Sequence, residues 1–408
     1  MLQRLIHSAR VNVFESARFY YGVLVVLTLH LIARHSLIKI LLVNGEAEWF
    51  ASKAITALLY GLVYGCCIIS AIFLRLRISK LFLYTWLTIS CISVFNEFVF
   101  YLSDPNAFDF ISSISTGQGF MNIRITLPIL FLGVWQATDD HARFSNRFLD
   151  LIYNLTLLNS AFVCVGVIFD ISIFESYPIS GRWGYSGFLA RGYSVILSSI
   201  FLICLFRRPQ LNFVNILLMT LALLFSGTKA GVLSFGFIIF LIIIKQKSIR
   251  IGVAGIVGVL LLTLPNWIPR VVSYSDFWNV VYSKHGAWGV LFSLRNENVE
   301  KFIDIINNEY GVINWILGGK LRFENFWIEL VVLDFFGFYG ITGLLVFLVF
   351  YFKWLDNWGG SIPILVALWS GSLIAAPLIF IVWGIWVSNS NLKPYKQFLT
   401  FKLSCYSV

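Results

Sequence analysis

Long apolar runs that contain no charged residue recur along the whole chain, for example at 20–32, 231–244 and 335–350. A helix crosses the hydrocarbon core of a bilayer with about 20 mostly apolar residues, whereas strands of membrane barrels alternate apolar and polar residues over about ten. These runs are continuous, so they predict helices. Of the 408 residues, 59% are hydrophobic and only 12% are charged, which excludes a water-soluble globular protein, where about 25% are charged. The predicted fold class is an all-α polytopic membrane protein.

The apolar segments between polar breaks predict 11 or 12 transmembrane helices. They lie at 19–33, 52–74, 81–101, 122–137, 148–172, 188–206, 211–226, 230–244, 251–266, 328–352 and 361–388. The last segment is interrupted by Ser370-Gly371-Ser372 and by Pro377, so it is either one tilted helix or two helices that meet at a turn, and we favour two. Three regions result: 1–264 with the first nine helices, 265–326 as one large extracytoplasmic loop, and 327–408 with the C-terminal helices and tail.

The net charge of +10 would suggest a nucleic-acid partner in a soluble protein, but here its distribution indicates orientation. With the N-terminus inside, 14 Lys and Arg fall in the short cytoplasmic segments and seven in the short outer ones. This bias follows the positive-inside rule, and no nucleic-acid partner is predicted. The seven outer residues are Arg34, Lys39, Lys53, Arg124, Arg182, Arg191 and Lys229.

The outer loop at 180–188, SGRWGYSGF, combines glycines, aromatic residues and one arginine. Trp183 and Tyr185 could stack on sugar rings, and Arg182 could bind a phosphate group. An aromatic belt at the membrane interface with a snorkelling arginine is the alternative.

Three further outer residues are candidates for function. Arg191 lies three residues inside the predicted span that begins at 188, where a charge is costly and therefore suggests a functional role. Lys229 lies in the small-residue turn SGTKAG at 226–231, which is either near a bound phosphate or part of a closely packed structural hairpin. His285 is a single histidine on a polar loop, where a solvated side chain is the simpler interpretation.

The large loop at 265–326 contains amphipathic stretches, such as 298–306 with Val299, Phe302, Ile303 and Ile306 on one face. They predict short helices on the membrane surface. The charged residues of this stretch are most simply a solvated face. No metal-ligand spacing is formed by the six cysteines.

In its order of motifs, the chain resembles the integral-membrane O-antigen polymerases of the Wzy type, relatives of the O-antigen ligases. The resemblance rests on the 182–188 loop, the SGTKAG turn, Arg295 in a large outer loop, the ILGG sequence at 316–319 and the segment from Glu324 through Asp334 to Gly343. It covers about 180–345 by motif and the rest by hydropathy. Ligases carry a histidine before asparagine where this chain has Glu324-Asn325, whereas polymerases show an acidic cluster that Glu329 and Asp334 resemble.

The resemblance implies a metal-independent glycosyltransferase of the polytopic class in the bacterial inner membrane, with no cofactor. It implies that a glycan on undecaprenyl diphosphate is transferred to a new lipid-linked repeat unit at the outer face of the membrane, with a chain-length regulator protein as a further partner. The expected catalytic residues are Glu329, Arg191 and Arg295. The residues expected to bind diphosphate or sugar are Arg182, Lys229, Arg322, Glu324, Asp334, Tyr185 and Trp183.

Two other functions remain alternatives. One is an O-antigen ligase. The other is a lipid-linked oligosaccharide flippase or other transporter, which would place charges on broken helices near the bilayer midplane and often has repeated halves. The sequence indicates neither feature.

Overall fold

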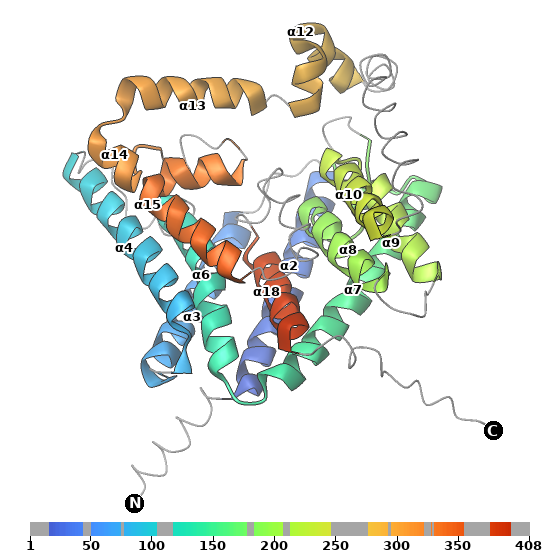
Figure 1. The fold of residues 1–408 in the computed structure, drawn as a ribbon. Helices are drawn as coiled ribbons and strands as arrows, with labels where there is room; N and C mark the ends of the chain where they lie inside the picture. The colour runs from blue at the N-terminus through green and yellow to red at the C-terminus, as the bar shows by residue number, and fades with distance from the viewer. Residues whose placement is uncertain are drawn as a thin grey trace, which may run out of the picture.

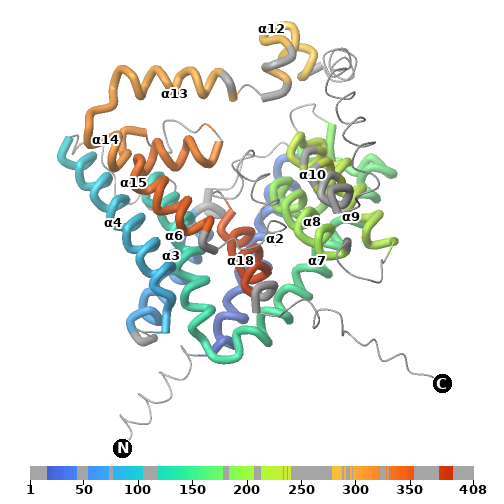
Figure 2. The backbone as a smooth tube through the Cα atoms, in the orientation of Figure 1, coloured from blue at the N-terminus to red at the C-terminus, as the bar shows by residue number. Residues whose placement is uncertain are grey.

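The chain is described by a computed structural model over residues 16–43, 50–74, 77–103, 117–177, 183–206, 213–245, 276–292, 295–321, 328, 330–354 and 376–392. Helices dominate these residues (Figures 1 and 2), and the only β pairings in them are two isolated bridges, Ser16 with Asp139 and Glu175 with Tyr185. Within these described ranges, six helices are long and apolar enough to cross a membrane. The predicted class of polytopic helical membrane protein is therefore confirmed.

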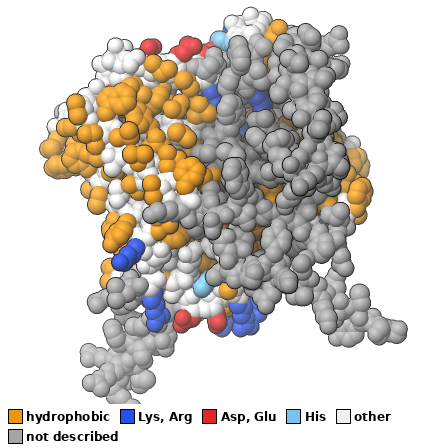
Figure 3. All heavy atoms as spheres, viewed as in Figure 1, with side chains coloured by type: hydrophobic (Ala, Val, Ile, Leu, Met, Phe, Trp, Pro, Cys, Tyr) orange, Lys and Arg blue, Asp and Glu red, His pale blue; other side chains and the backbone are white. Residues whose placement is uncertain are grey.

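The six long helices coincide with predicted spans. They are α2 (Ala17–Val43), α3 (Phe50–Leu74), α4 (Lys80–Ser103), α6 (Gln118–Ala137), α7 (His141–Phe169) and α15 (Val331–Trp354). Their outer surfaces carry large exposed apolar side chains, such as Leu58 and Leu62 on α3 and Val94 on α4. Figure 3 shows hydrophobic side chains covering the flank of the molecule on the side of α3 and α4. An exposed apolar surface of this kind is what lipid contact requires.

Shorter apolar helices occupy the other predicted spans. They are α8 (Arg191–Phe206), α9 (Phe213–Phe225), α10 (Lys229–Lys245) and α18 (Pro377–Leu392). With 13 residues, α9 is about 20 Å long, which is less than the ~30 Å of a hydrocarbon core. The predicted span 251–266 and most of the tract before Pro377 lie outside the described residues. Pro377 itself starts α18, a position where its missing N–H costs no hydrogen bond.

Hydropathy alone did not indicate which helices form the centre. In the most apolar 18-residue stretch of α6, 72% of the residues are buried, against 22% in that of α2. Residues 376–387 at the start of α18 are all buried, including Trp383, and α18 packs on α6 and α7 (Figure 1). Helices α6 and α18 form the core. Helices α3, α4 and α15 lie on one side of it, and α8, α9 and α10 lie on the other (Figure 2).

The large polar loop contains three helices, α12 (Asp276–Phe292), α13 (Arg295–Glu309) and α14 (Val312–Leu317). They lie at the end of the bundle opposite the turn between α6 and α7 (Figure 1). The predicted amphipathic helix at 298–306 falls within α13, where Phe302 is buried and Glu300 and Asp304 are exposed. The Ile303 side chain, expected on the apolar face, is 49% exposed.

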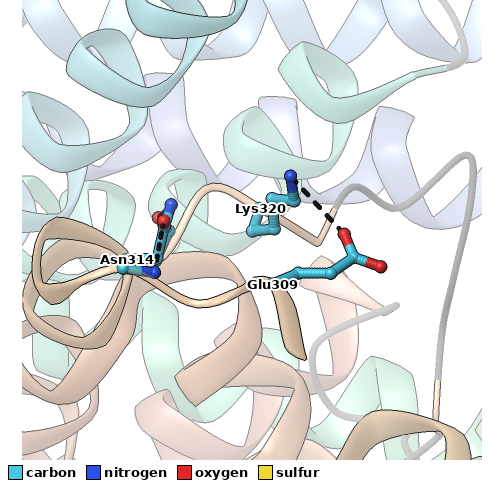
Figure 4. Close-up of polar contacts among 5 residues, drawn as sticks. Glu309, Asn314 and Lys320 are labelled. Atoms are coloured by element: carbon cyan, nitrogen blue, oxygen red, sulfur yellow. Dashed lines mark hydrogen bonds and ion pairs between the residues drawn. The ribbon is translucent and has the colours of Figure 1, made fainter. Parts of the chain in front are cut away.

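Short polar contacts join α13 and α14 to the turn that follows α14. Lys320 pairs with Glu309 at 3.4 Å, and the Asn314 side chain donates to the Gly318 carbonyl at 3.1 Å (Figure 4). Both side chains of the ion pair are about half exposed, so it adds little to stability. It lies between the end of α13 and the turn that follows α14.

One predicted boundary is wrong. The first span was expected to end at residue 33, which would leave Arg34 and Lys39 in a short outer loop, but α2 continues to Val43. The helix extends because Lys39 is buried, and its ammonium group hydrogen-bonds to another part of the chain.

Candidate functional site

Three segments that the sequence analysis assigned to the outer side of the membrane fold against one another, although they are far apart in the chain. They are the chain after α7 (170–177), which includes the short 3₁₀ helix η2 (Ser172–Phe174), the loop before α8 (183–190), and the turn between α9 and α10 (226–228). The Tyr185 N–H donates to the Phe225 carbonyl at 2.7 Å, and the Ser176 N–H donates to Gly184 at 2.8 Å. The Ser176 hydroxyl also donates to the Ser226 carbonyl at 2.9 Å. We call these three segments the outer knot.

Glycines allow the closest approach within the outer knot. Gly184 and Gly227 have φ values of 149° and 65°, a region that other residues rarely adopt. A Cβ on Gly184 would lie 2.6 Å from the Ser226 carbonyl oxygen, and one on Gly227 would lie 2.6 Å from the Gly184 Cα. The two sequence motifs, the 182–188 loop and the SGTKAG turn, are therefore in direct backbone contact.

Lys39 of α2 fixes the outer knot to the bundle. Its Nζ donates to the Ser186 hydroxyl at 2.7 Å and to the Gly187 carbonyl at 2.6 Å. Asn159 of α7 holds the same loop, because its Oδ1 accepts the Leu189 N–H at 3.0 Å. The sequence had singled out neither residue as part of a site. Lys39 had served only as an indicator of orientation.

The outer knot also contains two carboxyl groups, Asp170 and Glu175, that the sequence analysis missed. The Tyr185 hydroxyl hydrogen-bonds to Asp170, and burial together with this bond raises the pKa of Tyr185 to about 12. Burial and the charge of Asp170 raise the pKa of the Glu175 carboxyl above 4.5. Two carboxylates five residues apart beside an outer aromatic loop were the available sequence signal. Such a pair can accept a proton from a hydroxyl group.

Cations lie around the outer knot. Arg191, at the start of α8, is exposed and its guanidinium lies 4.7 Å from the centre of the Tyr177 ring. The Lys229 ammonium, at the start of α10, lies 4.2 Å from the Trp278 ring of α12. The Trp183 side chain is 57% exposed and packs edge-on against Phe225. The site therefore offers positive charge, carboxylates and an open aromatic face.

Two other predicted site residues lie on different elements. Arg295 begins α13, near the 2.8 Å contact between His285 Nδ1 and the Glu297 carboxyl group that joins α12 and α13. Asp334 is 2% exposed in the first turn of α15, where its Oδ1 accepts the Ile328 N–H at 2.9 Å. This bond gives Asp334 a role in fixing the start of α15. Arg182, Arg322, Glu324 and Glu329 lie outside the described residues, so their predicted roles stay predictions.

Helix α15 contains a break that the sequence did not indicate. Gly340 interrupts α15 with φ 63° and ψ −169°, and it lies against the Gly318–Gly319 turn, because a Cβ there would be 2.6 Å from the Gly318 nitrogen. Asn96 of α4 bridges the two segments, donating to the Leu317 and Phe338 carbonyls at 2.9 and 3.0 Å. A small polar pocket opens beside this break. Its polar lining residues are Ser93, Asn96, Glu97, Gln118, Asn122 and Tyr339.

The fold and the outer knot define a multi-pass helical membrane protein with a polar site at one end of its bundle. In comparisons with protein families, characterised proteins and solved structures, the chain matches none. The chemistry of the site is therefore what indicates a function.

Proposed function

We propose that the protein polymerises lipid-linked oligosaccharide repeat units at the outer face of the bacterial cytoplasmic membrane. The observation that carries this proposal is the outer knot. It joins the aromatic 183–188 loop and the SGTKAG turn into one site with Arg191 and Lys229 beside it and Asp170 and Glu175 within it. The donor would be a glycan on undecaprenyl diphosphate, and the acceptor would be the non-reducing end of a new repeat unit.

In this reaction an acceptor hydroxyl attacks the anomeric carbon of the donor sugar, and the bond from that carbon to the diphosphate oxygen breaks. The diphosphate leaves with the electron pair, and a carboxylate takes the hydroxyl proton. Arg191, Lys229 and Arg295, with Arg182 and Arg322, would stabilise the negative charge of the leaving group, since preorganised cations lower the energy of a developing anion. Glu329 is our choice for the acceptor-side base, and Glu175 is a second candidate because its raised pKa suits proton transfer.

The proposed orientation places the outer knot and α12 to α14 outside the cell and the turn between α6 and α7 in the cytoplasm. Figure 3 supports it, because Lys and Arg side chains gather at the lower end of the view, where that turn lies in Figure 1. A basic cytoplasmic end is the expected pattern. A chain-length regulator protein is the proposed protein partner.

A transporter of lipid-linked sugars is the second candidate. The break in α15 at Gly340, beside a pocket lined by Asn96, Gln118 and Asn122, favours it, because transporters bind substrates at discontinuous helices. The ligase alternative has no such observation in its favour.

The decisive experiment is the glycan profile of a deletion strain that is complemented with the gene. A lipid core that carries one repeat unit indicates a lost polymerase. A core without any repeat indicates a lost ligase or flippase and would overturn the proposal. Assay of repeat-unit flipping in membrane vesicles then separates these two alternatives.

A further inference from the structure

A second group of basic side chains lies between helices of the bundle, apart from the residues of the outer knot. Arg34 and His35 belong to α2 and Arg124 belongs to α6. His35 interacts electrostatically with Arg34, Lys39 and Arg124, and its ring lies 5.7 Å from that of Tyr193 on α8. Three helices thus bring two arginines, a histidine and a tyrosine to one place. We call Arg34, His35 and Arg124 the inner basic cluster.

Arg124 is the best-defined member of the inner basic cluster. Its guanidinium lies 5.4 Å from the Phe120 ring centre, and its Nε is buried without a hydrogen-bond partner among the described residues. Its electrostatic neighbours in that part of the chain are Tyr60, Tyr193 and the like charge of Arg34. None of these neighbours is a carboxylate.

An anion beside Arg124 would offset the cost of this arrangement. Burying an arginine among membrane helices is costly, by roughly 2.5–3.5 kcal/mol at a helix centre and by less towards the ends, and a second guanidinium nearby adds repulsion. Arg124 is six residues from the start of α6, which places its Cα about 9 Å along the helix. That depth is close to the boundary between lipid headgroups and acyl chains. The anionic group found there in every membrane is a lipid phosphate.

We propose that the inner basic cluster binds the phosphate group of a membrane lipid, with Arg124 and Arg34 as its principal ligands. Guanidinium groups hold phosphate oxygens through paired N–H donors, and the buried Nε of Arg124 is a donor available for this role. The lipid is either a polyisoprenyl phosphate or diphosphate, or a glycerophospholipid. This inference does not rest on glycan transfer, because a transporter of the same lipids would need the same site.

The test uses the full-length protein, stripped of lipid in a maltoside detergent and examined by native mass spectrometry. The probes are undecaprenyl phosphate, phosphatidylglycerol and diacylglycerol, of which only the last lacks phosphate. The variants are Arg124→Gln and Arg34→Gln. Arg147→Gln on α7 is the matched control, because its guanidinium lies 5.6 Å from the Phe144 ring but is exposed at the other end of the bundle.

We expect the wild type to bind at least one phosphate lipid and not diacylglycerol. Arg124→Gln should weaken this binding on the order of tenfold or more, as loss of a charged hydrogen bond predicts, and Arg147→Gln should not. Preference for undecaprenyl phosphate supports a substrate-lipid site, and equal binding of both phosphate lipids supports a general lipid site. Unchanged binding by Arg124→Gln, or diacylglycerol binding as tight as phosphate-lipid binding, overturns the proposal. If Arg124→Gln does not fold, Arg34→Gln is judged by the same criterion.

Discussion

The Lys39 ammonium of α2 donates a 2.6 Å hydrogen bond to the carbonyl oxygen of Gly187, a residue 148 positions further along the chain. The bond joins the first long helix to the aromatic loop that precedes α8. Gly187 has φ 66°, and a Cβ there would lie 2.5 Å from the Asn159 Oδ1, so the loop is held from two sides. The buried Lys39 and the Asn159 amide therefore both fix the position of the outer knot on the bundle.

Lys39→Met should lower the stability of the protein by about 2 kcal/mol. The substitution keeps most of the side-chain volume but removes charged hydrogen bonds to Ser186 and Gly187, each worth roughly 1.5–3 kcal/mol, while it relieves the cost of burying the charge. Thermal unfolding in detergent, followed by size-exclusion fluorescence, measures the change. Lys80→Met, at an exposed site on α4, is the control. Equal stability of the two variants would show that Lys39 does not hold the loop.

Gly227→Ala should destabilise the protein by about 1–3 kcal/mol, because alanine is strained at φ 65° and its Cβ would press on the Gly184 backbone. Gly236→Ala on α10 is the matched control, since a Cβ there meets nothing within 4 Å and the glycine is in a helix. The control should be neutral or slightly stabilising. The same unfolding assay compares them, and a tolerated Gly227→Ala would argue against close contact between the two outer loops.

Glu175→Gln should raise the melting temperature at pH 7 and have no effect below pH 4.5. Burial and Asp170 raise the pKa of Glu175 above 4.5, so the folded protein binds this proton more tightly than the unfolded chain. The folded protein is therefore destabilised as the pH rises through the pKa of the folded-state Glu175. Above that pKa, the ionised carboxylate lowers the free energy of unfolding by its full amount. Melting curves from pH 4 to pH 8 test the sign. Glu300→Gln, exposed on α13, should show no such difference.

Arg191→Ala should abolish polymer formation while the protein still accumulates in the membrane. In the proposed reaction, its exposed guanidinium beside Tyr177 contacts the diphosphate, and losing this contact removes stabilisation of the negative charge that develops on the leaving group. Arg191→Lys should restore little activity, because an ammonium lacks the planar donor pair. Polymer length in the complemented deletion strain and immunoblots of the membrane fraction measure both quantities. Full-length polymer from Arg191→Ala would remove this residue from the mechanism.

Alkaline phosphatase fused after residue 290 should be active, and the enzyme fused after residue 78 should be inactive. The reporter folds only outside the cytoplasm, and the basic turns place residue 78 inside. Residue 290 lies in α12 at the end of the bundle where the outer knot is found. The reverse pattern would put every proposed site residue on the wrong side of the membrane.

The sequence by itself was sufficient to predict the fold class and the places of most helices. Whether a segment crosses a bilayer depends on the length and hydrophobicity of that segment, and both are local properties. The apolar runs at 52–74, 81–101 and 328–352 became α3, α4 and α15 almost residue for residue. Glycines and aromatic residues likewise indicated the 183–188 loop and the SGTKAG turn as candidates for function, although not that they touch.

Tertiary structure decided what those local properties leave open. Nearly all helices are apolar, so hydropathy cannot distinguish the protein-facing α6 from the lipid-facing α2. The contact of Tyr185 with Phe225 and the burial of Lys39 depend on how distant helices pack. The break at Gly340 depends on a backbone angle that glycine permits but does not require. The sequence shows which side chains are charged and which are apolar. Only the packing of the helices determines which of the buried charges has a hydrogen-bond partner.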